Sequence, residues 1–111
     1  MERSPVKLLE YLDEQGRNPF REWLEGLRDH QARARIRARL NRVRLGNFGD
    51  SKSVGGGVFE LRIPYGPGYR IYFGRDGDKV VILLTGGDKR RQARDIALAQ
   101  TLWDDYQRRK P

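Results

Sequence analysis

Residues 58–73 read VFELRIPYGPGYRIYF, and this stretch decides the fold. Apolar and polar side chains alternate on both sides of a Pro-Tyr-Gly-Pro-Gly turn, which predicts an antiparallel hairpin. The apolar sets are Phe59, Leu61 and Ile63 on the first strand and Tyr69, Ile71 and Phe73 on the second. Both sets must lie on one face, because a slip of one residue would bury the charges of one strand. The hairpin therefore has one apolar face and one polar face.

Arg62 and Arg70 share the polar face. If residues 64–68 form the loop, Arg62 stands opposite Arg70, and Glu60 stands opposite Tyr72. Like charges opposed in this way cost a sheet up to about 1 kcal/mol. A phosphate bound between the two arginines makes their arrangement favourable, because each guanidinium group can donate two hydrogen bonds to phosphate oxygens. We therefore predict an anion site; the alternative is that Glu60 bridges both arginines in a surface ion-pair network.

The sequence before the hairpin predicts one strand and two helices. Residues 6–13 form an apolar run typical of a strand, although a helix is not excluded. Asn18 and Pro19 supply the N-cap and first position of a helix. Asp29 can cap a second helix that ends near Leu45. The apolar faces are Phe20, Trp23, Leu24 and Leu27 on the first helix and Ala32, Ile36, Leu40 and Val43 on the second.

Glycines mark the connections on either side of the hairpin. Residues 46–57 are polar and glycine-rich, which predicts a mobile loop, and they do not match the phosphate-binding GxxxxGK[ST] pattern. Residues 80–84 are continuously apolar, as in a central strand covered on both faces. Gly86, Gly87 and Asp88 are expected to end that strand, and Lys89 to begin a closing helix. The apolar face of that helix is Ile96, Ala99, Leu102, Trp103 and Tyr106.

These elements predict the fold class. We expect a single α+β domain over residues 1–111, with the order β-α-α-β-β-β-α. Its sheet should be twisted, mainly antiparallel and four-stranded, packed by a helical hairpin and a C-terminal helix.

The charge of the chain predicts a polyanionic partner. Its 111 residues carry 23 Lys and Arg against 15 Asp and Glu, a formal charge of +8, and eighteen of the basic residues are arginine. Six arginines lie between Arg33 and Arg44, and no acid lies between His30 and Gly49. Such a run is either a solvated face or a surface for an anionic partner, and the missing acidic neighbours favour the partner. Nucleic acid and acidic proteins both fit this charge.

Several classes of protein are not expected. The chain has no cysteine and one histidine, which excludes a disulfide framework, a thiol nucleophile and a histidine metal cluster. No apolar run approaches the about 18 residues of a membrane helix, and the N-terminus lacks a signal-peptide core. We expect a cytoplasmic protein without metal, cofactor or membrane contact.

The segment Gly86-Gly87-Asp88-Lys89 is a second candidate anion site. A helix that begins here presents free N–H groups and partial positive charge to an anion. Lys89, Arg90 and Arg91 would strengthen that field. The alternative is that Asp88 is an ordinary N-cap with solvated basic neighbours.

Four segments together resemble a known family. Residues 59–63 (FELRI), 68–73 (GYRIYF), 84–89 (LTGGDK) and 92–97 (QARDIA), in this order and spacing, resemble the RelE/ParE toxin superfamily. The resemblance covers nearly the whole chain and is strongest to the HigB-like, phage Gp49-like branch of addiction-module killer proteins. It implies a RelE-like fold and a toxin of a type II toxin–antitoxin system. The expected partners are an antitoxin with a helix-turn-helix domain, the ribosome and mRNA.

The resemblance also implies a reaction and residues for it. Members of the family cleave mRNA on the ribosome without a metal, by attack of a ribose 2′-OH on the adjacent phosphate. Arg70 matches the family's transition-state arginine, Arg62 a basic position on the preceding strand, and Lys89 the basic cluster after the last strand. Candidates for proton transfer are Glu60, Tyr72 and Lys89, the last if neighbouring arginines favour its neutral form. Candidates for RNA binding are Arg90, Arg91, Arg33, Arg37, Arg44 and Lys52.

Two rival functions remain. One is a ParE-like poison of DNA gyrase, although cations clustered on the sheet face are not needed to bind a protein. The other is a basic RNA-binding module without catalytic activity. Because Arg70 is expected to point away from the core, Arg70→Ala should preserve the fold.

Overall fold

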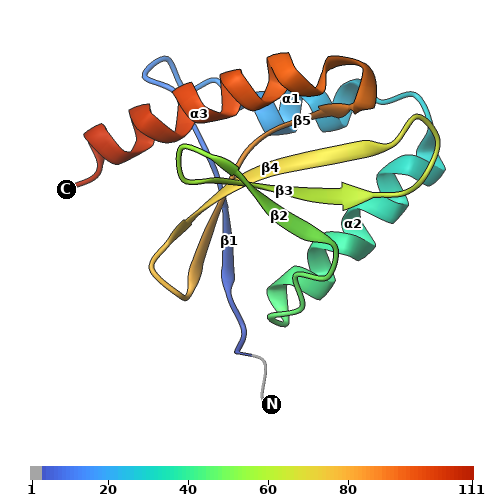
Figure 1. Cartoon of the computed structure of the whole chain (residues 1–111), viewed down its shortest axis with the longest axis horizontal. Coiled ribbons are helices and arrows are strands. Elements are labelled where there is room, and N and C mark those ends of the chain that lie inside the picture. The colour runs from blue at the N-terminus through green and yellow to red at the C-terminus, as the bar shows by residue number, and fades with distance from the viewer. Residues whose placement is uncertain (1–3) are drawn as a thin grey trace.

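The structure is a computed structural model that describes residues 4–111. Within this range the chain forms one five-stranded sheet with strand order β1-β5-β4-β3-β2, together with three α-helices (Figure 1). The strands are β1 (Lys7–Glu10), β2 (Ser51–Gly55), β3 (Val58–Ile63), β4 (Tyr69–Asp76) and β5 (Val80–Asp88). The helices are α1 (Pro19–Gly26), α2 (His30–Arg44) and α3 (Gln92–Arg109), with a short 3-10 helix η1 (Lys89–Arg91) before α3.

The prediction of an α+β fold with a mainly antiparallel sheet is confirmed, with one correction to the number of strands. The sheet has a fifth strand, β2, and it is mixed, because β1 pairs in parallel with β5 while the other neighbours are antiparallel. Strand β1 can pair in parallel because α1, α2 and the hairpin lie between it and β5 in the sequence. Such a crossover is the connection that parallel strands require.

The hairpin has the predicted register. Arg62 lies opposite Arg70, and Glu60 lies opposite Tyr72. The apolar face packs under α1 and α2, where Leu61, Ile63, Ile71 and Phe73 join the first core. The other face is not the open polar surface that the alternation predicted, because α3 covers part of it. A second core there contains Val58, Tyr72, Ile82, Leu84, Ala99 and Trp103.

The mobile loop predicted at 46–57 contains strand β2, so that prediction is wrong. Ser51–Gly55 pairs antiparallel with β3 along one edge of the sheet. Gly55, Gly56 and Gly57 then turn the chain at φ values of 90°, 63° and 83°, which glycine adopts without strain. The backbone ladder holds β2 in place, although its side chains do not alternate in the usual way.

The end of β5 also differs from the prediction. Gly86, Gly87 and Asp88 continue the strand, with Gly87 paired to Arg70 and Asp88 to Tyr69. Asp88 then caps η1 by accepting a hydrogen bond from the Arg90 N–H. Helix α3 therefore begins at Gln92 rather than at Lys89.

The predicted starts of α1 and α2 are confirmed. The Asn18 side chain accepts a hydrogen bond from Arg21 N–H, and the Asp29 carboxylate accepts from the N–H groups of Gln31 and Ala32. The predicted stripe of α2 is buried, and Arg39 is buried beside it. Among the helices described, none is long and apolar enough to cross a membrane.

Candidate phosphate-binding site

A pocket of about 310 Å³ opens at the end of the β3–β4 hairpin. It brings together three cations that the sequence singled out, Arg62 from β3, Arg70 from β4 and Lys89 from η1. Lys89 comes next to the hairpin because the residue before it, Asp88, pairs with Tyr69. The remaining lining residues are Asp50, Ile63, Pro64, Gly68 and Tyr69. The lining therefore contains more positive than negative side chains, as a site for an anion requires.

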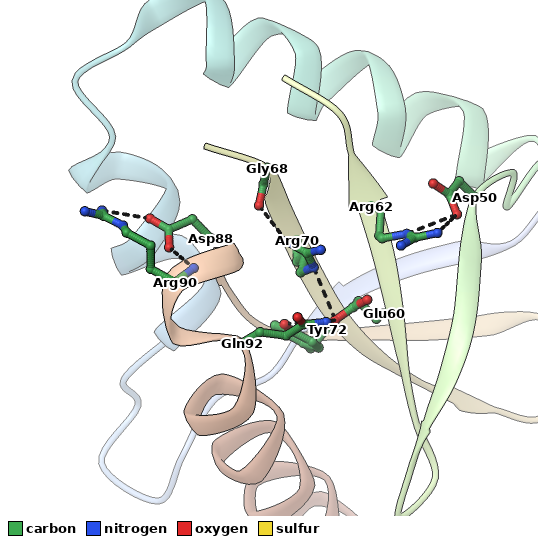
Figure 2. A network of polar contacts seen from close by, with 9 residues as sticks. All are labelled: Asp50, Glu60, Arg62, Gly68, Arg70, Tyr72, Asp88, Arg90 and Gln92. Carbon is green, nitrogen blue, oxygen red and sulfur yellow. Dashed lines mark hydrogen bonds and ion pairs between the residues drawn. The ribbon is translucent and has the colours of Figure 1, made fainter. Parts of the chain in front are cut away.

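Arg62 lies on the open side of the pocket and faces Asp50. Its Nε and Nη2 atoms donate to Asp50 Oδ1 at 3.2 and 3.1 Å (Figure 2). The Arg62 side chain is 42% exposed and that of Asp50 is 55% exposed, so solvent weakens this ion pair. An anion can therefore compete with Asp50 for the guanidinium group.

Arg70 lies deeper and is 8% exposed. Its Nη1 donates to the carbonyl oxygen of Gly68 at 3.0 Å, and its Nε lies 3.5 Å from Glu60 Oε2 (Figure 2). The Nε atom makes no hydrogen bond within residues 4–111. The contacts with Gly68 and Glu60 fix the Arg70 side chain along the pocket wall. In the part of the chain that the structure describes, Glu60 pairs with Arg70 but does not bridge both arginines.

Glu60 is fully buried and holds a small polar network. Its Oε2 accepts hydrogen bonds from Tyr72 Oη at 3.1 Å and from Gln92 Nε2 at 2.8 Å. Burial, followed by the charge of Glu60 and its hydrogen bond, raises the pKa of Tyr72, so its hydroxyl stays protonated. Neither Glu60 nor Tyr72 lines the pocket. Glu60 contacts Arg70, and Tyr72 contacts Glu60, so both residues lie behind Arg70 rather than in the pocket lining.

The same network changes what is expected of Arg70→Ala. Truncation would leave the Glu60 carboxylate buried without its cation, and breaking such a pair costs about 3–5 kcal/mol. The expectation that this variant preserves the fold is therefore not supported by the structure.

The other cations of this region lie around a second pocket. Arg90 and Arg91 line a pocket of about 530 Å³ with Trp23, Gly86, Gly87, Asp88 and Asp95. Asp88 Oδ1 accepts a hydrogen bond from the Arg90 N–H at 2.9 Å, as an N-cap does, and Asp88 Oδ2 accepts one from Arg90 Nη2 at 3.0 Å.

Most of the chain matches a known family of proteins. The family model for phage-derived Gp49-like proteins matches residues 22–104. The chain belongs to this Gp49-like family. An uncharacterized protein of Haemophilus influenzae is 51% identical over 83 residues, which are 75% of this chain and 84% of the relative. The Gp49-like family falls in the RelE/Gp49 group of toxin-like proteins. Membership therefore suggests a toxin of a toxin–antitoxin system, for which an antitoxin is the implied partner.

The remaining RNA-binding candidates of this Gp49-like chain lie outside the phosphate pocket. Arg37, Arg44 and Lys52 are exposed, whereas Arg33 is half-buried and donates to the carbonyl oxygen of Glu25. Arg39, one of the six arginines of α2, donates instead to the carbonyl oxygens of Phe48 and Asp50. The surface of α2 therefore offers fewer free arginines than its sequence suggests.

Sequence reasoning missed two residues of the site. Asp50 lies in the segment 46–57, for which the sequence predicts a mobile loop, so the alternation of the hairpin does not place it beside Arg62. Gln92 lies in the QARDIA segment, yet its contact with Glu60 depends on how α3 crosses the sheet. No group of three or more His, Cys, Asp or Glu residues within 4–111 is arranged to hold a metal.

Proposed function

We propose that this protein is the toxin of a type II toxin–antitoxin pair, HigB-like in its activity, and that it cleaves mRNA on the ribosome. The observation that carries the proposal is the convergence of Arg62, Arg70 and Lys89 in one pocket. Membership of the Gp49-like family supports the same reading.

In the proposed reaction the ribose 2′-oxygen attacks the adjacent phosphorus. The bond to the 5′-oxygen breaks, which leaves a 2′,3′-cyclic phosphate and a 5′-OH. The proton of the 2′-OH is removed, and a proton is delivered to the departing 5′-oxygen. Negative charge grows on the phosphate oxygens during attack, and fixed cations stabilise that charge.

The residues divide between direct and supporting roles. Arg70 contacts the phosphate through its guanidinium group, and Arg62 joins it when the anion displaces Asp50. Lys89 is the candidate for proton transfer, because it lines the pocket while Glu60 and Tyr72 do not. Glu60, held by Tyr72 and Gln92, positions Arg70.

The exposed arginines of α2 would serve a separate step. Ribosomal RNA is a polyanion whose phosphates bind arginine without regard to sequence. Arg37 and Arg44 lie on the exposed part of this helix and would help to dock the protein. Lys52 on β2 would add to the same attraction.

The test is to map mRNA 5′ ends after brief induction in cells. New ends in translated messages, in register with codons and absent without induction, support the proposal. Intact messages with double-strand DNA breaks would instead identify a gyrase poison. RNA binding with intact messages and intact DNA would identify a module without catalytic activity.

Arg70→Lys is the most informative variant for this assay. It keeps a positive charge beside Glu60 but loses the guanidinium fork, so we expect cleavage to fall about 100-fold or more. Arg75→Lys is the matched control, because Arg75 lies on the same strand and donates to the carbonyl oxygen of Asp78 instead. Cleavage by Arg70→Lys at the wild-type rate would contradict the role of Arg70.

A further inference from the structure

The second pocket lies at an open edge of the sheet. Strand β1 pairs with β5 only from Val80 to Leu83, whereas β4 accompanies β5 as far as Asp88. The backbone of Gly86 and Gly87 thus has a strand on one side and the pocket on the other. This opening measures about 530 Å³, within the usual range for small-ligand sites.

Trp23 gives the pocket an aromatic wall. The six-membered ring of its indole lies so close to Gly86 that a Cβ at that position would overlap it. Phe20 and Tyr69 pack against the indole, each with ring centroids 6.1 Å from it. The half-buried indole is therefore held in place while still lining the pocket.

Asp95 contributes a carboxylate from the first turn of α3. It approaches Gly87 so closely that a Cβ there would overlap the carboxylate. Within the described chain Asp95 makes neither a hydrogen bond nor an ion pair through its side chain, unlike Asp88, which is bonded to Arg90. Burial raises the pKa of Asp95, although Arg91 and Arg94 act in the opposite direction. A half-buried carboxylate without partners in the chain can accept hydrogen bonds from a ligand in the pocket.

The two pockets adjoin along the chain. Lys89 lines the phosphate pocket, and the next two residues, Arg90 and Arg91, line the edge pocket. Arg70 of the first pocket is paired in the sheet with Gly87 of the second. A phosphate at Arg70 would thus leave a neighbouring nucleotide beside the edge pocket.

We propose that the edge pocket binds a nucleobase of the RNA and that Asp95 selects guanine there. The inference rests on the proposed function for its biological role, but binding of the base is a separate property. Single-stranded RNA is commonly read by stacking bases on aromatic rings and bonding their Watson–Crick edges. Trp23 supplies the ring, and Asp95 supplies the acceptors.

The preference for guanine follows from the donors on each base. An ionised carboxylate only accepts hydrogen bonds. Guanine offers two adjacent donors, N1–H and the N2 amino group, which match the two carboxylate oxygens. Adenine and cytosine offer an amino group next to an acceptor nitrogen. Uracil offers N3–H between two carbonyl oxygens, which the carboxylate repels.

The test is an NMR titration of the full-length protein with the 5′-monophosphates of guanosine, adenosine, cytidine and uridine. Since all four carry the same phosphate, differences between them report the base. We expect GMP to shift the Trp23 indole N–H signal at concentrations about tenfold lower than the others. The indole of Trp103, buried in the second core, should stay unchanged.

Two variants sharpen the result. Asp95→Asn replaces one acceptor by a donor, so we expect GMP binding to weaken about tenfold or more and AMP binding to hold or improve. Asp104→Asn is the matched control, because Asp104 lies on the same helix but outside the pocket lining and pairs with Arg108, and it should retain the preference for GMP. Equal binding of all four nucleotides, or an unchanged preference in Asp95→Asn, would overturn the proposal.

Cleavage mapping separates this inference from the proposed function. A wild-type protein that cleaves messages with no guanine preference near the cut, and binds all four nucleotides alike, refutes the base pocket alone. Selective GMP binding by a protein that cleaves no message refutes the ribonuclease and leaves the pocket standing.

Discussion

Arg70 is held from both sides rather than left free at the surface. The carbonyl oxygen of Gly68 and the carboxylate of Glu60 contact its guanidinium group, and Glu60 is in turn held by Tyr72 and Gln92. A side chain held in this way loses little conformational freedom when it binds a phosphate. Such preorganisation is what stabilisation of a developing charge requires.

The pairing of Glu60 with Arg70 can be measured by a double-mutant cycle. Arg70→Gln alone leaves a buried carboxylate unpaired, so we expect it to lower the free energy of unfolding by about 3 kcal/mol. Adding Glu60→Gln should recover part of that loss, because the second change removes the unpaired charge. Urea denaturation of the two single variants and the double variant gives the coupling energy. A coupling energy indistinguishable from zero would contradict the ion pair.

Among the secondary-structure elements, the hairpin could be predicted because its alternation leaves one register that puts the apolar residues of both strands on one face. The same reasoning identified Arg62 and Arg70 as neighbours. Lys89 was also identified, as part of a second candidate anion site after the last strand. Short-range patterns were sufficient for these residues.

The missed features depend on contacts that no local pattern reports. Strand β2 is held by backbone hydrogen bonds to β3, and its sequence SKSVG resembles a loop. The end of β5 contains two glycines, which usually interrupt a strand, but here they let Trp23 and Asp95 pack against the backbone. The covering of the polar face by α3 depends on the path of the whole chain.

Helix α2 provides a prediction about salt. Removing one cation that binds a phosphate should reduce the slope of log affinity against log salt by about 0.7–0.9. Arg37→Ala with Arg44→Ala should therefore lower the slope for ribosomal RNA by about 1.5 if both arginines bind phosphates. Binding measured at several salt concentrations gives this slope.

The matched control for α2 removes two arginines that already have acidic partners. Arg17 pairs with Glu22 and Arg108 pairs with Asp104, both on the exposed surface. Arg17→Ala with Arg108→Ala makes the same change in net charge. If this control reduces the slope as much as the α2 variant does, the attraction is a property of net charge and α2 has no special part in it.

At the scale of the whole molecule, two carboxylates fasten the end of α3 to the rest of the fold. Asp76 at the end of β4 accepts hydrogen bonds from Tyr106 Oη at 2.7 Å and Lys110 Nζ at 3.1 Å. Asp105 on α3 accepts from Tyr11 Oη at 2.5 Å. Hydrogen bonds from Tyr106 and Lys110 lower the pKa of Asp76, and the bond from Tyr11 lowers that of Asp105. Burial, followed by Asp76, raises the pKa of Tyr106 to about 12.

These shifts predict loss of stability in acid. A carboxyl group whose pKa is lowered in the folded state stabilises the fold fully above its usual value of 3.8. That contribution disappears as the pH falls through the lowered folded value. We expect Asp76→Asn with Asp105→Asn to unfold with a flatter pH dependence below about pH 5. Denaturation curves at several pH values measure this, and an unchanged dependence would show that other groups control acid unfolding.

The parallel pairing of β1 with β5 has a consequence for how the protein is made. Lys7 pairs with Val80, so the first strand leaves the ribosome long before its partner strand exists. Pairings between segments far apart in the sequence form late, because a long loop must close first. The hairpin can fold from neighbouring residues, yet Gln92 reaches Glu60 only after α3 begins to emerge. A nascent chain interrupted before α3 would thus carry the arginine pair without the support that fixes Arg70.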